Sequence, residues 1–543
     1  MPAGVSKQHS LEGKKILVKQ DDPEYINRPN IDGAKYMING EIRKWDGAIQ
    51  TVYSPIFLEG TEEKVQIGCQ ARLTPKESLE ALDAAVAAWG NGAGEWPQMS
   101  LSSRIACMEK FVELLKPQRE IIVKVLMWEI CKVRPDAEKE FDRTMDYINA
   151  TIKAAKELHN AENNLTEESG ILAMIRRKPI GVMLNLGPFN YPFNETYTTL
   201  IPAILMGNTC VMKLPNVGCL AHIPTMEAFA QCFPKGVVNF ISGAGRETMP
   251  PIMETGKVDI FAFIGGSKAA DALIKNVPNP HKLKLCLSLE AKNVAIVMED
   301  ADLDNAVSEC VLGSLSYNGQ RCTALKQLMI HTSVMDKFME KFVAAVGSLK
   351  AGLPWEEGVQ ITPLPEPSKP EYLAELRADA MEKGANVVSP GAAQGWGHTM
   401  VFPSIVYPTN MDMRVMQEEQ FGPLVSVGTF SSMEEIADYV KQSKYGQQAA
   451  VFTSSDVSNL GPLLDVLVNC VSRVNVNSQC QRSPDSFPFT GRKSSALGTL
   501  SVVEALKPMI VESLVATKGE ERISLFNKVI DSKRCTFLDL QKI

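Results

Sequence analysis

The chain has 543 residues, of which 45% are hydrophobic, and its formal net charge is −7. At roughly 100–200 residues per domain, this length predicts two to four domains with a large core. The small negative charge gives no sign of a nucleic-acid or membrane partner, and we expect neither.

Twelve cysteines and six histidines are spread along the chain. The cysteines are too sparse for a disulfide scaffold, and no Cys/His ligand pair appears, so we expect a reducing compartment and no metal. Residues 1–22 mix both charges and contain no apolar core segment, unlike a targeting peptide. No apolar run approaches the roughly 18 residues of a membrane helix. These features favour a cytoplasmic protein.

The first clear helix covers residues 75–89. Thr74 is the expected N-cap, Pro75 the first helical residue, and Glu77 the partner of Thr74 in a capping box. Gly90 is expected to end the helix. Further helical patterns cover about 101–132 and 136–158, with Pro117 and Pro135 as expected interruptions.

From about residue 179, short apolar runs alternate with helical stretches. The runs are 180–188, 208–215, 237–245, 258–266, 283–290 and 293–299, and the helical stretches include 194–207, 222–232 and 246–256. This alternation predicts a doubly wound parallel sheet, in which ligands bind at the carboxyl ends of the strands. Those ends carry Asn190, Lys213, Gly243, Gly245, Gly265 and Gly266.

A second alternating series from about 303 to 490 predicts a second α/β domain, which carries Cys322. Cys322 follows Asn-Gly-Gln-Arg, and the charge of Arg321 is expected to favour its thiolate form. On spacing alone, a nucleophile and an inert small residue are equally good interpretations. The Gly243-Ala-Gly245 turn is a weak dinucleotide signal, because the third glycine is missing.

Five segments carry a resemblance to a known family: "LGPFNYPFN" (186–194), "VMKLPN" (211–216), "NGQRCTALK" (318–326), "EEQFGPLV" (418–425) and "SFPFTGRKSS" (486–495). In order and approximate spacing they resemble the aldehyde dehydrogenase superfamily over residues 35–517. Tyr191 after Asn190, the "GQRCTA" run and "QRSPDSFPF" are most similar to its non-phosphorylating, NADP-dependent glyceraldehyde-3-phosphate dehydrogenases.

The resemblance implies an α/β fold with three parts. These are a nucleotide-binding domain (35–161 and 181–302), a catalytic domain (303–504) and oligomerisation strands (162–180 and 505–517). Residues 518–543 form a C-terminal tail beyond the resemblance. It also implies a homotetramer or a homodimer.

The resemblance assigns the chemistry to particular residues. Cys322 would attack the aldehyde, and the Asn190 side chain and the Cys322 amide would hold the oxyanion. The cofactor would be NADP, with NAD as the alternative, held by Lys213, Asn216, Gly243, Gly265, Ser267, Glu419 and Phe421. Asn216 stands where NAD-preferring relatives often carry a glutamate, so a 2′-phosphate is not repelled.

Arg143, Tyr191, Arg321 and Arg482 would bind the phosphate of a small phosphorylated aldehyde, since phosphate needs fixed cationic donors. The expected reaction is oxidation of glyceraldehyde 3-phosphate to 3-phosphoglycerate through a cysteine thioester. Two alternatives stay open. One is a dehydrogenase for another small anionic aldehyde, and the other is a catalytically impaired scaffold of the same fold.

The general base is ambiguous. The family carries this glutamate in a "LELGGK"-like strand end, where this chain reads "CLSLEAKN" (286–293). An alignment without gaps back from Cys322 puts Ser288 at the glutamate position, and a two-residue deletion puts Glu290 there. Glu290 is the candidate base because it is the one carboxylate in this segment within reach, and Ser288 is the competing assignment.

Overall fold

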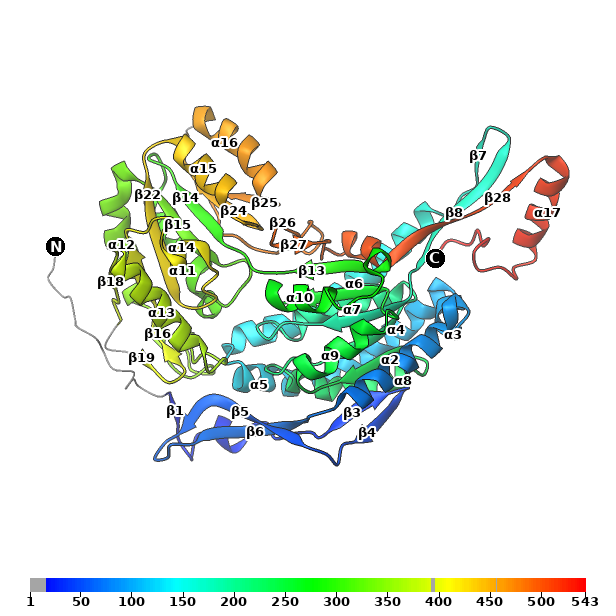
Figure 1. Cartoon of the computed structure of the whole chain (residues 1–543), viewed down its shortest axis with the longest axis horizontal. Coiled ribbons are helices and arrows are strands. Elements are labelled where there is room, and N and C mark those ends of the chain that lie inside the picture. Colours follow the sequence, from blue (N-terminus) through cyan, green and yellow to red (C-terminus); the bar gives the residue numbers. More distant parts are fainter. Residues whose placement is uncertain (1–15, 392–395, 456) are drawn as a thin grey trace.

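The computed structural model describes residues 16–391, 396–455 and 457–543. Residues 1–15, on which part of the targeting argument rests, lie outside the described residues. Two sheet-and-helix bodies lie side by side, and a long strand arm projects from one end (Figure 1). No helix in these described ranges combines the length and apolarity needed to cross a membrane.

An eight-stranded sheet forms the first body. Its order is β27(Ala496–Leu497), β13(Lys284–Ser288), β12(Ile260–Ile264), β9(Val182–Leu186), β10(Thr209–Lys213), β11(Val238–Ile241), β3(Lys35–Ile38) and β4(Glu41–Lys44). The run from β13 to β11 is parallel, and antiparallel strands close both sides. The predicted parallel sheet is confirmed.

Helices cover both faces of this sheet, as a doubly wound fold requires. They are α2(Pro75–Trp89), α4(Leu101–Leu115), α5(Arg119–Glu129), α6(Arg134–Ala161), α7(Asn194–Leu205), α8(Met226–Cys232), α9(Gly245–Glu254) and α10(Ser267–Ile274). Along β9, Val182 and Leu184 pack into the core with α2, while Met183 packs into the core with α7 on the opposite face. This alternation is why three consecutive residues of β9, Val182 to Leu184, are apolar.

The capping box that begins α2 is present as predicted, and Gly90 ends the helix in a left-handed conformation. The expected breaks near Pro117 and Pro135 are both present: residues 116–118 separate α4 from α5, and α6 begins at Arg134. Pro135 occupies the first turn, where a backbone N–H has no helical partner and a proline costs little.

A seven-stranded sheet forms the second body. Its order is β18(Asn386–Val388), β21(Ser404–Tyr407), β22(Leu424–Phe430), β15(Leu325–His331), β14(Asn293–Val297), β24(Gln448–Phe452) and β25(Arg473–Val476). Its longer helices are α11(Leu303–Leu315), α12(Met335–Gly347), α13(Lys369–Glu382), α15(Met433–Gln442) and α16(Val457–Cys470).

The expected domain boundary at 302/303 needs correction. β14 pairs with β15 and β24 in the second sheet, so the chain changes sheets between Ser288 and Asn293. In addition, β27, from the segment expected in the catalytic domain, pairs with β13 of the first sheet. A short apolar strand has the same pattern in either sheet, so the sequence could not assign these two.

The arm is a three-stranded antiparallel sheet of β28(Ile510–Lys518), β8(Ile171–Pro179) and β7(Thr166–Glu168). The two segments predicted to form oligomerisation strands thus pair with each other. The tail contains α17(Glu520–Asp531) and folds back along the arm (Figure 1). There, Phe526 and Leu538 cover Met174, and the buried Arg176 guanidinium donates to the Asp539 carbonyl.

The remaining elements are short or peripheral. A four-stranded sheet combines β1(Leu17–Val18), β5(Ile49–Leu58), β6(Lys64–Ala71) and β2(Ile31–Gly33). The others are α1(Pro23–Ile26), α3(Glu95–Gln98), α14(Arg414–Gln417), β16(Lys350–Ala351), β17(Val359–Ile361), β19(Trp396–Gly397), β20(Met400–Val401), β23(Tyr445–Gly446) and β26(Arg492–Lys493).

Candidate active site

Two cavities meet at Cys322, between the two bodies. The larger, of about 740 Å³, extends along the carboxyl ends of β9, β12 and β13 toward the start of α13. The smaller, of about 260 Å³, lies between α6, α11 and the loop at 479–483. Among the described residues, Cys322 and Glu195 are the two that line both cavities.

The backbone before Cys322 is strongly bent. Tyr317, Asn318 and Gly319 all have positive φ, and the Asn318 side chain donates to the Thr362 carbonyl at 3.0 Å. After the bend, the Asn293 amide donates to the Cys322 carbonyl at 2.8 Å. These contacts fix the main chain on both sides of the thiol.

Arg321 is not among the groups with the largest effects on the pKa of Cys322, and the thiolate form expected from the sequence is not favoured overall. Its guanidinium donates to the Leu312 and Gly313 carbonyls, at 3.2 and 2.9 Å. Burial raises the pKa of Cys322 to about 11, and the charge of Glu195 raises it further. Lys326 and Arg482 oppose this effect only in part. Without ligands, the side chain is a thiol at neutral pH.

The Asn190 side chain is positioned by the chain itself. Its amide donates to the Gln320 carbonyl at 2.8 Å, which holds it beside the cysteine loop. The buried Lys132 donates to the Asn190 carbonyl at 2.9 Å, and its ammonium lies 3.4 Å from the centre of the Tyr191 ring. Glu140 pairs with Lys132 and accepts from the amides of residues 193 and 194.

Sequence reasoning missed Lys132 and Glu140. The signal was Lys132 within the largely apolar stretch "WEICKV" and Glu140 within "AEKEFD". Two opposite charges that a fold buries completely are usually paired with each other. In this protein the pair fixes the segment that carries Asn190 and Tyr191.

Lys213, Asn216 and Gly243 lie at adjacent strand ends but do not line the larger cavity. The Lys213 ammonium donates to the Asn216 side chain at 3.2 Å, and burial lowers the pKa of Lys213 to about 8. No carboxylate of the described residues pairs with it. Gly243 has φ +108°, and a Cβ there would lie 2.7 Å from the Leu73 carbonyl oxygen. A buried, unneutralised cation beside a required glycine suits an anionic group.

Glu419 and Phe421 line the larger cavity together with Gly265. Glu419 accepts from the Ala291 amide at 3.1 Å and pairs with Lys326. Lys326 also donates to the Cys322 carbonyl at 3.2 Å. The carboxylate of Glu419 is thus fixed relative to the nucleophile, as a residue that orients a cofactor should be.

Ser288 and Glu290 occupy different places. Ser288 ends β13, is buried, and lines the larger cavity with Cys322. Glu290 also lines this cavity, but its carboxylate accepts from the Ser267 amide at 2.9 and 3.0 Å and from the Ser267 hydroxyl at 3.2 Å. Glu290 therefore caps α10, where Ser267 was expected to contact the cofactor.

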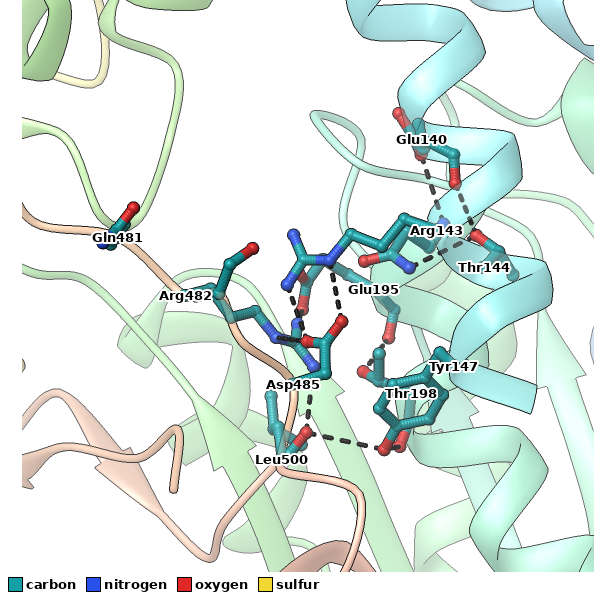
Figure 2. Close-up of polar contacts among 12 residues, drawn as sticks. Glu140, Arg143, Thr144, Tyr147, Glu195, Thr198, Gln481, Arg482, Asp485 and Leu500 are labelled. Atoms are coloured by element: carbon teal, nitrogen blue, oxygen red, sulfur yellow. Dashed lines mark hydrogen bonds and ion pairs between the residues drawn. The ribbon is translucent and has the colours of Figure 1, made fainter. Parts of the chain in front are cut away.

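The arginines predicted to bind phosphate line the smaller cavity, but two of them are paired with carboxylates (Figure 2). Arg143 binds Asp485 through two hydrogen bonds, of 2.9 and 2.6 Å. Arg482 pairs with Glu195, lies 3.3 Å from Asp485, and donates to the Leu500 carbonyl at 2.9 Å. Arg321 contacts only neutral oxygens among the described residues.

Asp485 and Glu195 are thus site residues that sequence reasoning did not single out. Glu195 was recognisable as the only acidic residue in the largely apolar segment 193–206. Asp485 lies inside "QRSPDSFPF", three residues after Arg482, but its pairing with Arg143 spans 342 positions and has no local signal.

Comparison with known proteins identifies the class. The family model described as "Aldehyde dehydrogenase family" matches residues 32–514, so the chain belongs to this family, and the predicted resemblance and fold are confirmed.

Its relatives include the NADP-dependent glyceraldehyde-3-phosphate dehydrogenase of Streptococcus equinus, 34% identical over 80% of this chain and 90% of that one. The Triticum aestivum protein of the same name is 31% identical over 88% and 93%. The Bacillus halodurans structure of that name, complexed with NADP, superposes with a TM-score of 0.81 at 29% identity, covering 90% of this chain and all of the other.

Proposed function

We propose that this protein oxidises glyceraldehyde 3-phosphate to 3-phosphoglycerate with NADP as the oxidant. The observation that carries the proposal is the smaller cavity. Its lining brings the Cys322 thiol together with Tyr191, Arg143, Arg321 and Arg482. The relatives named for this reaction support the same substrate.

Cys322 attacks the aldehyde carbon as the thiolate and forms a hemithioacetal. The Asn190 side-chain amide and the Cys322 backbone amide donate to the oxyanion, and each such donor typically contributes about 10²–10³ in rate. Bound NADP would supply the two-electron oxidant, as the acceptor of the hydride from the hemithioacetal carbon. Cys322 then holds the acyl group as a thioester until water releases the acid, and no acyl phosphate forms.

The residues of the chain fit an NADP molecule. The buried Lys213 ammonium, beside Asn216 and Gly245, is free of carboxylates in the described part of the chain and suits a phosphate of the adenosine end. Glu419, fixed by Ala291 and Lys326, suits the ribose next to the nicotinamide. Six glutamates and one lysine, Lys369, are among the residues lining the larger cavity, so this cavity suits the nicotinamide end better than the phosphates.

Arg321 contributes the unneutralised charge for the substrate phosphate. Arg143 and Arg482 are balanced by Asp485 and Glu195, so these four groups sum to zero charge. Tyr191 adds a hydroxyl to the same cavity. A phosphate therefore binds mainly through Arg321, with Arg143 and Arg482 joining if they exchange a carboxylate for it.

This neutralisation favours a second candidate, another small anionic aldehyde that carries a single negative charge. A relative of this kind is the 3-sulfolactaldehyde dehydrogenase of Priestia aryabhattai, 26% identical over 76% of this chain and 85% of that one. A sulfonate has one negative charge and requires less cationic excess than a phosphate dianion.

The test is NADPH formation by purified protein from glyceraldehyde 3-phosphate in buffer free of inorganic phosphate. We expect turnover with 3-phosphoglycerate as the product, and none in Cys322→Ala. Preference for 3-sulfolactaldehyde would select the second candidate. Absence of NADPH with every anionic aldehyde, despite bound NADP, would favour the non-catalytic scaffold.

A further inference from the structure

Glu195 is placed where the reaction needs a base. It lies in the first turn of α7, and its amide donates to the Tyr191 carbonyl at 3.1 Å. Only Glu195 and Cys322, among the described residues, line both the cofactor-side and the substrate-side cavity. A water molecule that attacks a thioester on Cys322 must occupy this same junction.

The two oxygens of the Glu195 carboxylate have different surroundings. Oε2 pairs with Arg482, whose guanidinium is held in turn by the Leu500 carbonyl and Asp485. Oε1 accepts no hydrogen bond from the described residues. The ion pair therefore fixes the carboxylate in one orientation and leaves one oxygen available to water.

The electrostatics of Cys322 support this proximity. Among the neighbouring charged groups, Glu195 has the largest effect on the pKa of the Cys322 thiol, and its charge raises that pKa. A side chain that carries a negative charge this close to the sulfur is also close to an acyl group attached to that sulfur.

The other two assignments are weaker. Ser288 faces the cavity, but a hydroxyl accepts a proton poorly at neutral pH. Glu290 has both oxygens engaged by Ser267 at the start of α10. Glu195 is the carboxylate with the largest effect on the pKa of the Cys322 thiol, and among the described residues it is the one carboxylate that lines both cavities.

We propose that Glu195 is the general base that activates water for hydrolysis of the Cys322 thioester, an inference that rests on the proposed dehydrogenase function. Glu195 Oε1 accepts a proton from water, and the oxygen of that water forms a bond to the thioester carbon. The Asn190 and Cys322 amides hold the oxyanion. The C–S bond then breaks, which releases the carboxylic acid and the Cys322 thiolate. The proton leaves Glu195 to the solvent, and no electrons are transferred in this step.

The test separates the first turnover from later ones in the full-length protein with NADP and glyceraldehyde 3-phosphate. Glu195→Gln keeps the shape and a hydrogen-bonding side chain but removes the base. We expect an initial burst of NADPH close to the number of sites, followed by steady turnover slowed about 10²-fold or more. Glu227→Gln, an exposed glutamate of α8, is the matched control and should behave as the parent.

A second variant restores the base by another route. In Glu195→Gln combined with Ser288→Glu, a carboxylate returns to the same cavity wall, and we expect steady turnover to recover at least tenfold. A structural role of Glu195 would not be rescued from position 288. If Glu195→Gln shows no burst, Glu195→Asp becomes the deciding variant. It keeps the negative charge but has a side chain shorter by one methylene, which moves the carboxylate away from the thioester. A burst followed by slow turnover in Glu195→Asp supports the proposal.

Failure of the inference and failure of the proposed function give different results. Normal steady turnover in Glu195→Gln, or in Glu195→Asp where that variant decides, overturns the base assignment and leaves the dehydrogenase intact. A stall in Glu290→Gln with none in Glu195→Gln assigns the base to Glu290. No NADPH formation by the parent protein, with any anionic aldehyde, overturns the function itself.

Discussion

At the residue scale, Arg321 is the arginine proposed to bind the substrate phosphate, because it pairs with no carboxylate of the described residues. Its side chain contacts the Leu312 and Gly313 carbonyls and Gln479, none of which is charged. A charge-assisted hydrogen bond contributes about 1.5–3 kcal/mol, so Arg321→Gln should lower kcat/KM for glyceraldehyde 3-phosphate by about 10- to 150-fold.

The control for Arg321→Gln is unphosphorylated glyceraldehyde, for which the loss should be much smaller. The same comparison for Arg482→Gln should show losses on both substrates, because that change also leaves the buried Glu195 unpaired. Equal losses on both aldehydes in Arg321→Gln would contradict a phosphate role.

The reactivity of Cys322 gives a pH prediction. Its pKa is raised from 9.0 to about 11, so at pH 8 roughly one thiol in a thousand is ionised in the free protein. Alkylation of Cys322 by iodoacetamide should rise about tenfold per pH unit until the pH approaches 11. Removal of the charge in Glu195→Gln lowers this pKa and should accelerate alkylation at pH 8.

Peptide mass spectrometry measures the modification of Cys322 separately from the other eleven cysteines. A plateau near pH 9 in the parent protein would show that burial does not suppress the thiolate. A rate unchanged in Glu195→Gln would show that Glu195 is not close to the sulfur.

The sequence allowed some of these residues to be predicted and not others. Cys322, Asn190 and the arginines stand in local motifs that the chain shows directly. Glu195 and Asp485 matter through partners at distant positions, Arg482 and Arg143. The Lys132–Glu140 pair is local in sequence, but the segment that it fixes lies more than 50 positions away. A pairing over that distance depends on how α6 and α7 pack against the 482–485 segment, which no local pattern records.

At the element scale, the Glu290 carboxylate binds the N-terminus of α10 at Ser267, where the resemblance places a cofactor contact. Glu290 accepts from the Ser267 amide, which stabilises the helix N-terminus by about 0.3–1 kcal/mol. Glu290→Gln should lower the free energy of unfolding by that amount. It should also tighten NADP binding, because an anionic cofactor then meets one negative charge fewer in the larger cavity.

Thermal unfolding and fluorescence titration of NADP measure the two effects separately. The gain in affinity should shrink at high salt, since screening weakens exposed charges. Weaker NADP binding in Glu290→Gln would contradict this account and show that the carboxylate itself holds the cofactor.

The elements differ in how well the sequence predicted them. The α2 capping box follows from local chemistry and was predicted with both helix ends, and β10, β11 and β12 each lie within a predicted apolar run. The sheet to which β14 belongs was not predicted, because strand partners are chosen by packing across both sheets.

At the scale of the whole molecule, the arm presents an uncovered apolar face. Leu514 and Ile175 lie opposite each other on β28 and β8 and are 59% and 45% exposed. If the protein is a homodimer or a homotetramer, as proposed from the resemblance, this face is a good candidate for the contact. Leu514→Glu should then shift the protein to smaller species in analytical ultracentrifugation.

Leu525→Glu is the matched control, because Leu525 is 63% exposed but lies on α17 of the tail. A parent protein that sediments as a monomer, or a Leu514→Glu variant with unchanged mass, would contradict the assembly. The tail itself was unpredicted. The tail packs on Arg176 and Met174 of the arm, and these residues are more than 350 positions away in the sequence from the tail residues that they contact.

The most direct test of the central claim is to trap the acyl group on Cys322. Protein, NADP and glyceraldehyde 3-phosphate are mixed, quenched in acid within the first turnover, and examined by intact-protein and peptide mass spectrometry. The account predicts a phosphoglyceryl adduct on the peptide that contains Cys322, in proportion to the NADPH formed and persistent in Glu195→Gln. NADPH formation with no adduct in Glu195→Gln, or an adduct on another residue, would contradict it.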